Sequence, residues 1–262
     1  MTLTLGPGPL GTQPGGDANY TIDGPAHRIW FQAHPRRIRA ELAGEVVLDT
    51  VGGHLLHESN LLPRLYVPFA DLDADRLTAT DHTTHCPFKG DAAYWTLTAG
   101  ERVRENAVWA YPDPLPAAPW LADFASVYHW AADVWYEEDE PVLGHFRDPY
   151  HRVDARRSAR RADVTARGET VASSERTVLV FETGLPPRPY VPRDDVAAEL
   201  VRSETTSVCP YKGAATYWSV KLGDRTLEDA AWSYEEPLPE AQAARGHVAF
   251  MHDELAVSVA AP

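Results

Sequence analysis

The feature that most constrains the fold of this chain is an internal repeat. The ten residues 86–95, CPFKGDAAYW, return at 209–218 as CPYKGAATYW, and the only two cysteines of the sequence lie in these two copies. Shifting the sequence against itself by 123 or 124 residues aligns many further rare residues in one register. The aligned pairs include Gly44 with Gly168, Glu58 with Glu182, Tyr66 with Tyr190, Trp109 with Trp232, and Tyr111 with Tyr234. The chain therefore contains two copies of one domain of roughly 100 residues, a usual size for an independent core.

The register predicts four segments. We expect an N-terminal extension at 1–36, partly mobile because it is rich in Gly and Pro, and a first domain at 37–142. A basic linker at 143–160 separates it from a second domain at 161–262. The linker arginines are expected to be solvated and to pair with the acidic domains, with an anion contact as the alternative. We also expect the two copies to pack on each other.

The hydrophobic pattern within each copy has a period of two. Segments such as 176–184, 216–234 and 247–259 read as short strands separated by turn residues. One short helix is predicted at 191–201, with its counterpart at 67–77, because early acidic residues suit a helix N-terminus. The predicted fold class is mainly β: two tandem copies of a small antiparallel β-barrel or sandwich, each with one short helix.

Composition excludes several classes of function. The sequence has 262 residues, of which 44% are hydrophobic, enough to fill two cores. No run of about 18 apolar residues and no secretory pattern is visible, so we expect no membrane partner and a cytoplasmic location with reduced thiols. A net charge of -14 argues against a nucleic-acid partner. Two cysteines are too few for a disulfide framework or a cysteine-based zinc site.

The order of motifs in the second copy resembles a known family. Glu182 is followed by PYVPRDDV, SVCPYKGAATYW and AAWSYEEPLP, and this order is similar to the DUF427 family of small β-rich domains, here in tandem. The first copy departs at Phe88, where the second has Tyr211, and at His57, where the second has Phe181. The resemblance implies a fold and a site location without an activity. A nucleotidyltransferase-like label has been given to the family, but the sequence lacks the Gly-Ser and paired aspartates of that chemistry.

The Cys-Pro-Tyr-Lys-Gly loop needs only two of its residues to form a turn. Pro210 sets φ for the second turn position, and Gly213 accepts the positive φ that ends it. Cys209 and Lys212 therefore need another explanation. A lysine close to a thiol would favour a thiolate nucleophile. The alternative is a small buried cysteine beside a solvated turn lysine.

Aromatic residues form a second candidate feature. Trp232 and Tyr234 are two apart on a predicted strand and share a face, whereas Tyr217 and Trp218 take opposite faces. With Tyr190 and Glu182 nearby, as the resemblance implies, they predict an aromatic pocket with one carboxylate, suited to a small organic or cationic ligand. The alternative is a core packed with aromatic rings.

Four histidines of the first copy have His-x-x-His spacings, His54 with His57 and His82 with His85. A spacing of three places side chains on opposite faces of a strand, so neither pair chelates a metal unless it lies in a turn or helix. We predict surface or core histidines and no metal site, with a metal site in the first copy as the alternative, and we predict no cofactor. No Ser-His-Asp or phosphate-loop pattern is present.

These observations predict a protein that binds, and could transform, a small organic molecule in an aromatic pocket beside the Cys-Pro-Tyr-Lys-Gly loop. The ligand's identity, turnover and the oligomeric state stay open, and the alternative is a non-catalytic scaffold of two pseudo-symmetric domains. The candidate catalytic residues are Cys209, Lys212 and Glu182. The candidate ligand-binding residues are Tyr190, Tyr211, Tyr217, Trp218 and Trp232 in the second copy and Glu58, Tyr66, Cys86, Lys89, Trp95 and Trp109 in the first.

Overall fold

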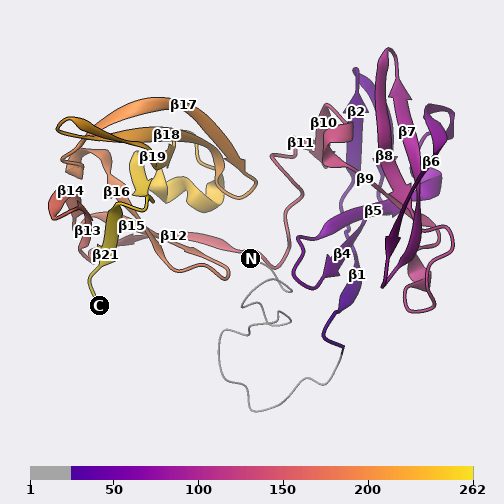
Figure 1. Cartoon of the computed structure of the whole chain (residues 1–262), viewed down its shortest axis with the longest axis horizontal. Coiled ribbons are helices and arrows are strands. Elements are labelled where there is room, and N and C mark those ends of the chain that lie inside the picture. The colour runs from indigo at the N-terminus through magenta and orange to yellow at the C-terminus, as the bar shows by residue number, and fades with distance from the viewer. Residues whose placement is uncertain (1–24, 262) are drawn as a thin grey trace. The chain divides into compact units, whose positions relative to one another are not determined.

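The computed structural model describes residues 25–261, which form two compact units, 25–148 and 149–261. Each unit is a set of antiparallel strands with short 3-10 helices (Figure 1). The mobility expected for the N-terminal extension concerns residues that largely lie outside the described part. The expectation that the two copies pack on each other stays a prediction. Within 25–261, no helix is long and apolar enough to cross a membrane.

The first unit contains two sheets. The larger has the strand order β1-β4-β5-β9-β8-β7-β6, and the smaller has the order β11-β10-β2-β3. The strands are β1 (Ile29–Ala33), β2 (Ile38–Leu42), β3 (Glu45–Thr50), β4 (His54–Glu58), β5 (Arg64–Pro68), β6 (Leu77–Cys86), β7 (Gly90–Ala99), β8 (Arg102–Ala110), β9 (Phe124–Val127), β10 (Val134–Glu137) and β11 (Glu140–Pro141). The 3-10 helices are η1 (Phe69–Asp71), η2 (Ala74–Arg76), η3 (Pro119–Leu121) and η4 (His129–Ala131).

The second unit repeats the larger sheet strand for strand. Its order is β12-β15-β16-β20-β19-β18-β17, beside a smaller sheet β14-β13-β21. The strands are β12 (Val153–Ser158), β13 (Ala162–Ala166), β14 (Glu169–Ser174), β15 (Thr177–Glu182), β16 (Arg188–Pro192), β17 (Glu199–Cys209), β18 (Gly213–Leu222), β19 (Arg225–Tyr234), β20 (His247–Phe250) and β21 (Leu255–Val259), with 3-10 helices η5 (Arg193–Asp195) and η6 (Pro239–Ala244). The predicted mainly β, tandem antiparallel architecture is confirmed.

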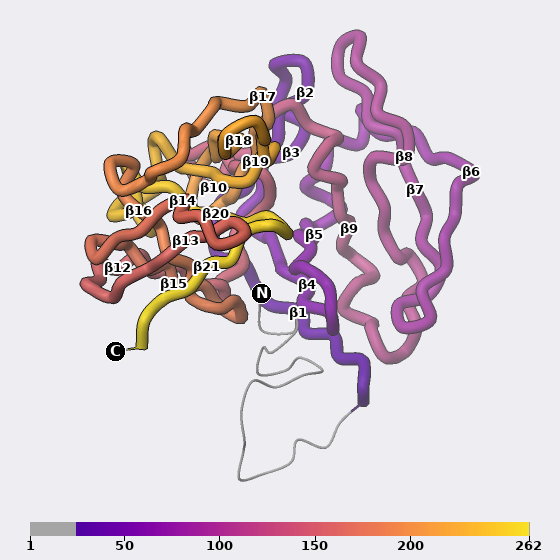
Figure 2. Tube along the Cα trace, turned by 60° about the vertical axis from the view of Figure 1, so that its left-hand side comes forward, coloured from indigo at the N-terminus to yellow at the C-terminus, as the bar shows by residue number. Residues whose placement is uncertain are grey.

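Long hairpins dominate both large sheets. Figure 2 shows β7 and β8 running alongside each other in the first unit, in the order that their backbone pairing gives. The predicted short helix at 191–201 is reduced to the three residues of η5, and β17 already begins at Glu199. Its counterpart at 67–77 likewise holds only η1 and η2. The chain extends after η5 because Val196 forms a bridge to Ala172 and packs against the core.

Each large sheet carries a different core on each face. Strand alternation sends Leu65 and Val67 of β5 to an aliphatic cluster and Tyr66 between them to an aromatic one. On the second unit's β19, Ala231 and Trp232 are divided in the same way. The aromatic faces of the two large sheets therefore carry most of the aromatic residues that the sequence singles out.

The first strand of each unit begins before the expected domain starts at 37 and 161. β1 lies in the segment taken as an N-terminal extension, and β12 lies in the segment taken as a linker. Both are edge strands of the large sheets: Ile29 pairs with Glu58, and Val153 pairs with Glu182. The linker residues Arg152, just before β12, and Arg156 make ion pairs with Asp154 of β12. These first strands place the amino-terminal end of each unit beside a candidate glutamate.

Candidate functional site

The repeated cysteine loop forms the turn that its Pro and Gly predict. The Lys89 amide donates to the Cys86 carbonyl at 3.2 Å, and the Lys212 amide donates to the Cys209 carbonyl at 3.3 Å. The glycine that follows each lysine has a φ of +106° at Gly90 and +105° at Gly213. A residue with a Cβ rarely adopts this backbone conformation, so glycine is required here.

The turn is held against a second segment of the same unit. The Leu238 amide donates to the Lys212 carbonyl at 3.1 Å, and the Leu115 amide donates to the Lys89 carbonyl at 3.0 Å. A Cβ added at Gly213 would lie 3.2 Å from the Glu236 carbonyl oxygen. This close approach fixes the position of the lysine at the end of the hairpin.

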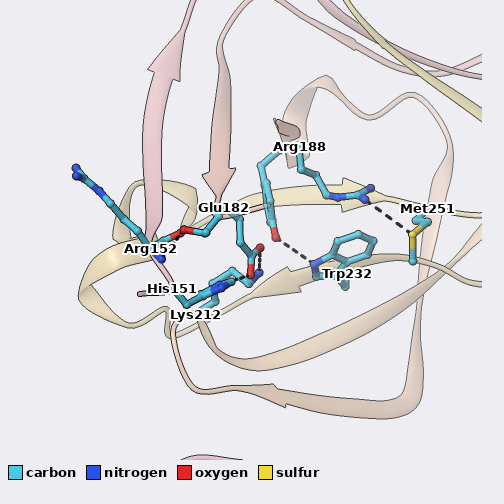
Figure 3. A network of polar contacts seen from close by, with 9 residues as sticks. His151, Arg152, Glu182, Arg188, Lys212, Trp232 and Met251 are labelled. Carbon is cyan, nitrogen blue, oxygen red and sulfur yellow. Dashed lines mark hydrogen bonds and ion pairs between the residues drawn. The ribbon is translucent and has the colours of Figure 1, made fainter. Parts of the chain in front are cut away.

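In the second unit, three charged or titratable side chains meet at this loop. Lys212 Nζ donates to Glu182 Oε2 at 2.5 Å, and His151 Nε2 lies 3.0 Å from Glu182 Oε1. The side chains point toward one another from β15, from the loop after β17 and from the segment before β12 (Figure 3). All three are largely buried, with exposed side-chain fractions of 13% for Lys212, 14% for Glu182 and 7% for His151. We call this group the His–Glu–Lys cluster.

The first unit builds the same cluster. Lys89 Nζ donates to Glu58 Oε2 at 2.5 Å, and His27 Nε2 lies 2.9 Å from Glu58 Oε1. The histidine rings pack on the aromatic residue of each loop, His27 on Phe88 at 3.7 Å between ring centroids and His151 on Tyr211 at 4.4 Å. Phe88 of the first unit is 42% exposed, whereas its counterpart Tyr211 in the second unit is 7% exposed. The two copies therefore differ at this position both in residue type and in burial.

Two sequence interpretations change here. The lysines are not solvated turn residues, because each is buried against a glutamate. Sequence reasoning also missed both histidines of the cluster. Extending the repeat register of 124 upstream aligns His27-Arg28 with His151-Arg152 and would have found them.

The cluster keeps its glutamate ionised. Burial raises the pKa of Glu182, but the hydrogen bonds from His151 and Lys212 outweigh burial and lower the pKa from 4.5 to about 2. General acid–base catalysis is most effective when the pKa of the catalytic group lies near the working pH. The geometry therefore favours a fixed negative charge at Glu182 over proton transfer, and its catalytic role stays a prediction.

The two cysteines lie at the edge of the aromatic clusters. Both are free thiols of intermediate exposure, and Cys209 packs against the cluster that contains Tyr190, Tyr211 and Tyr234. The amine of Lys212 is committed to Glu182 rather than directed to solvent. A thiolate role for Cys86 or Cys209 stays a prediction.

The aromatic residues separate by strand face. Tyr190, Tyr217, Trp232 and Tyr234 belong to one cluster of the second unit, and Tyr66, Tyr94, Trp109 and Tyr111 form its counterpart in the first. In each unit the tryptophan of this cluster packs edge-on against a tyrosine: Trp109 against Tyr66 of β5, and Trp232 against Tyr190 of β16. Trp232 Nε1 also donates to the Tyr190 hydroxyl at 3.1 Å.

The remaining two candidate tryptophans lie elsewhere. Trp95 of β7 and Trp218 of β18 lie on the faces opposite to the aromatic clusters, and they pack against the aliphatic clusters. Trp218 donates to Ser233 Oγ at 2.8 Å and lies under the Arg193 guanidinium at 4.4 Å. They support the core and do not join the aromatic faces.

A cavity of about 450 Å³ opens on the aromatic face of the first unit. Pockets for small ligands have roughly 300–1,000 Å³. It brings together an ion pair of the cluster, an arginine, the aromatic rings and a loop after β4. The lining residues are Leu56, Glu58, Asn60, Leu61, Leu62, Arg64, Tyr66, Lys89, Tyr94, Trp109, Tyr111 and Tyr128.

Three tyrosines of this cavity, Tyr66, Tyr111 and Tyr128, are neutral hydrogen-bonding groups at ordinary pH. Burial is the main cause that raises the pKa of Tyr66, Tyr111 and Tyr128 above the usual value. A neutral phenol can donate one hydrogen bond and accept others. The cavity therefore combines apolar ring faces with hydroxyl groups.

The corresponding face of the second unit differs in the residue at one position and in the contacts of one arginine. Strand pairing aligns Tyr128 with Met251, since Tyr128 follows β9 and Met251 follows β20 in equivalent register. Arg188, the counterpart of Arg64, donates to the Phe250 carbonyl at 3.1 Å and reaches Met251 Sδ at 3.9 Å. Figure 3 shows Arg188 extending past Trp232 toward Met251. In the first unit, Arg64 is exposed and its guanidinium lies 5.6 Å from the Trp109 ring centroid.

The four histidines noted for their spacing have separate environments. His54 Nδ1 lies 2.9 Å from the Gly52 carbonyl, His57 Nε2 lies 3.2 Å from Gln32 Oε1, and His85 pairs with Asp91 at 2.6 Å. Across residues 25–261, no group of three or more His, Cys, Asp or Glu side chains is arranged to hold a metal ion.

Fold and site together define a tandem, mainly β protein with a His–Glu–Lys cluster beside an aromatic face in each unit. The family model of the domain of unknown function DUF427 matches the chain twice, at residues 30–138 and 154–261. The chain belongs to this family, as its motifs indicate. A comparison with curated proteins found no match.

Proposed function

We propose that the protein binds a small organic molecule in the aromatic cavity of the first unit. The observation that carries this proposal is the cavity itself: its volume, about 450 Å³, fits a small ligand, and its lining combines ring faces with charged and hydroxyl groups. Apolar walls with a few convergent polar groups are typical of ligand sites. We expect one ligand per chain. On the aromatic face of the second unit, the Arg188 guanidinium contacts Met251 Sδ and is therefore not available to a ligand.

The His–Glu–Lys cluster has a positioning role in this proposal. Lys89 and Glu58 line the cavity and hold each other at 2.5 Å, while the Leu115 amide fixes the lysine's backbone. A ligand would therefore meet a polar wall whose geometry is set before binding, which reduces the entropy lost on association.

A fragment screen tests the proposal. Ligand-observed NMR with a chemically broad set of small aromatic molecules should give hits that compete with one another. A protein-observed ¹H–¹⁵N spectrum should then show that these hits perturb the indole N–H resonance of Trp109. The matched variants exchange the residues that differ between the units. Tyr128→Met should weaken the hits at least about tenfold by removing a ring wall, whereas Met251→Tyr should leave them unchanged.

Two outcomes contradict the proposal. Hits that are insensitive to Tyr128→Met place binding elsewhere, and a screen without competing hits removes the ligand-binding function. Native mass spectrometry of the hit complex should give one ligand per chain.

A scaffold role remains the second candidate, and one observation favours it for the second unit. There, the polar groups of the aromatic face form hydrogen bonds within the unit: Trp232 donates to the Tyr190 hydroxyl, and Arg188 donates to the Phe250 carbonyl. Under this alternative, Arg188→Met should lower the stability of the second unit and leave fragment binding unchanged. Denaturant unfolding followed by circular dichroism measures the first effect, and the screen measures the second.

A further inference from the structure

The charges at the first-unit cavity are unequally compensated. Glu58 has two cationic or hydrogen-bonding neighbours, Lys89 at 2.5 Å and His27 at 2.9 Å, so its charge is already balanced within the cluster. Arg64 differs. Among the residues that the structure describes, its guanidinium lies over the Trp109 ring, and no carboxylate pairs with it. The lining charge left available to a ligand is therefore positive.

In the second unit, the arginine at the equivalent position, Arg188, is bound by neighbouring groups of the protein. Arg188 also lies over an indole, at 5.2 Å from the Trp232 centroid, but its two terminal nitrogens are used by the Phe250 carbonyl and Met251 Sδ. In the first unit, Tyr128 takes the place of Met251, and its ring packs on Trp109 at 4.3 Å between centroids. The guanidinium of Arg64 is thus left exposed at the cavity, with five N–H donors in the plane of the group.

The walls near Arg64 suit a flat ring. Trp109 and Tyr128 supply aromatic faces, and Leu61 and Leu62 supply exposed apolar side chains from the loop after β4. Aromatic rings pack on one another in offset or edge-on geometry with a gain beyond the buried area. A guanidinium beside these walls matches the geometry of a carboxylate, which it can bind through two parallel hydrogen bonds.

We propose that the first-unit cavity selects a small aromatic monocarboxylate, with the carboxylate on Arg64 and the ring against Trp109 and Tyr128. This inference rests on the proposed function of the cavity and narrows it to one ligand class. Neutral tyrosine hydroxyls of Tyr66 and Tyr111 lie in the same cavity and can donate to a polar substituent on the ring.

The same charges exclude the cationic ligand that an aromatic pocket with a glutamate would suggest. A cation would need the Glu58 carboxylate, which Lys89 already occupies in a largely buried pair. It would also approach the fixed positive charge of Arg64 without a compensating anion. Both effects oppose a cation and favour an anion.

Three probes of similar size test the ligand class on the full chain: benzoate, benzamide and benzylamine. They share one ring and differ in charge. Isothermal titration or saturation-transfer NMR should give benzoate an affinity at least about tenfold higher than benzamide, because a hydrogen bond to a charged group contributes more than a neutral one. Benzylamine should bind more weakly than benzamide. The preference for benzoate should decrease as salt is added.

Variants locate the selecting charge. Arg64→Met should abolish the benzoate preference while leaving benzamide binding within about twofold, and Arg64→Lys should retain part of the preference. The matched control is Arg188→Met, the same change at the equivalent position of the second unit, which should leave all three affinities unchanged. Arg64 is exposed, so its substitutions should leave the thermal unfolding midpoint nearly unchanged, and that midpoint is measured alongside.

The outcomes separate the two proposals. Equal or better binding of benzamide or benzylamine, or a benzoate preference that survives Arg64→Met, overturns the anion inference and leaves the cavity as a binding site. No binding of any of the three probes at millimolar concentration also overturns the inference. In that case the broad fragment screen decides whether the cavity binds any ligand.

Discussion

Replacing Lys212 with Met probes the His–Glu–Lys cluster directly. Lys212 Nζ and Glu182 Oε2 are 2.5 Å apart, and the exposed fractions of the two side chains are only 13% and 14%. The substitution removes the ammonium and leaves Glu182 with His151 as its remaining hydrogen-bonding neighbour. Breaking a buried ion pair by removing one member costs about 3–5 kcal/mol, because the other charge stays buried without compensation.

The expected loss lies near the lower end of that range. His151 still donates to Glu182 Oε1 at 3.0 Å, so the carboxylate keeps one hydrogen bond. The lowering of the Glu182 pKa from 4.5 to about 2 corresponds to about 3 kcal/mol for the net effect of burial and both partners, which sets the same scale. We therefore expect Lys212→Met to lower the free energy of unfolding by about 3 kcal/mol. For a unit of this size, the unfolding midpoint should fall by about 10 °C.

Differential scanning calorimetry of the full chain measures this shift. The matched control is Lys221→Met, since Lys221 pairs with Glu199 on the same sheet but is 47% exposed. An exposed pair contributes less than about 1 kcal/mol, so this variant should unfold close to the wild-type temperature. The double variant Lys212→Met with Glu182→Gln should recover part of the loss, because no charge is then left unpaired.

Equal effects of Lys212→Met and Lys221→Met would refute the reasoning. They would mean that the buried pair contributes no more than a solvated one. A double variant less stable than Lys212→Met alone would show that His151, rather than the unpaired charge, determines the stability of the cluster.

Three further predictions concern stability. The folded-state pKa of Glu182 lies below its unfolded value, so its contribution to stability is complete above pH 4.5 and is lost as the pH falls toward 2. Glu182→Gln should flatten this part of an acid-unfolding curve recorded by circular dichroism. Burial lowers the pKa of His57, so its contribution to stability is present above pH 6.5 and declines as the pH falls below that value. His57→Phe, the residue found at 181, should reduce the pH dependence of stability below pH 6.5, and an unchanged curve would contradict this account. Gly213→Ala should cost about 1–3 kcal/mol in urea unfolding because φ is +105° and the new Cβ approaches a carbonyl, whereas a loss below about 0.5 kcal/mol would show that the turn adapts freely.

Local patterns account for the parts of the structure that the sequence predicts well. The repeat register and the period-two alternation depend on neighbouring residues, and they predict the tandem β architecture and the two faces of Tyr217 and Trp218. The turn at Cys209 follows from Pro210 and Gly213, whose backbone preferences are intrinsic. The helix expected at 191–201 is shorter than predicted because tertiary packing keeps the chain extended after η5.

Contacts between distant segments were decided by the tertiary structure. Glu182 meets His151 only because Val153 of β12 pairs with Glu182 of β15, which brings together residues 31 positions apart in sequence. Lys212 is buried by that same arrangement, although a lysine in a turn reads as solvated. The different contacts of Arg64 and Arg188 likewise depend on Tyr128 and Met251, which follow β9 and β20, strands far along the chain from the arginines. Sequence alone determined which residues recur and which strands they form; the pairing of strands decided which charges are buried, which are balanced and which one faces the cavity.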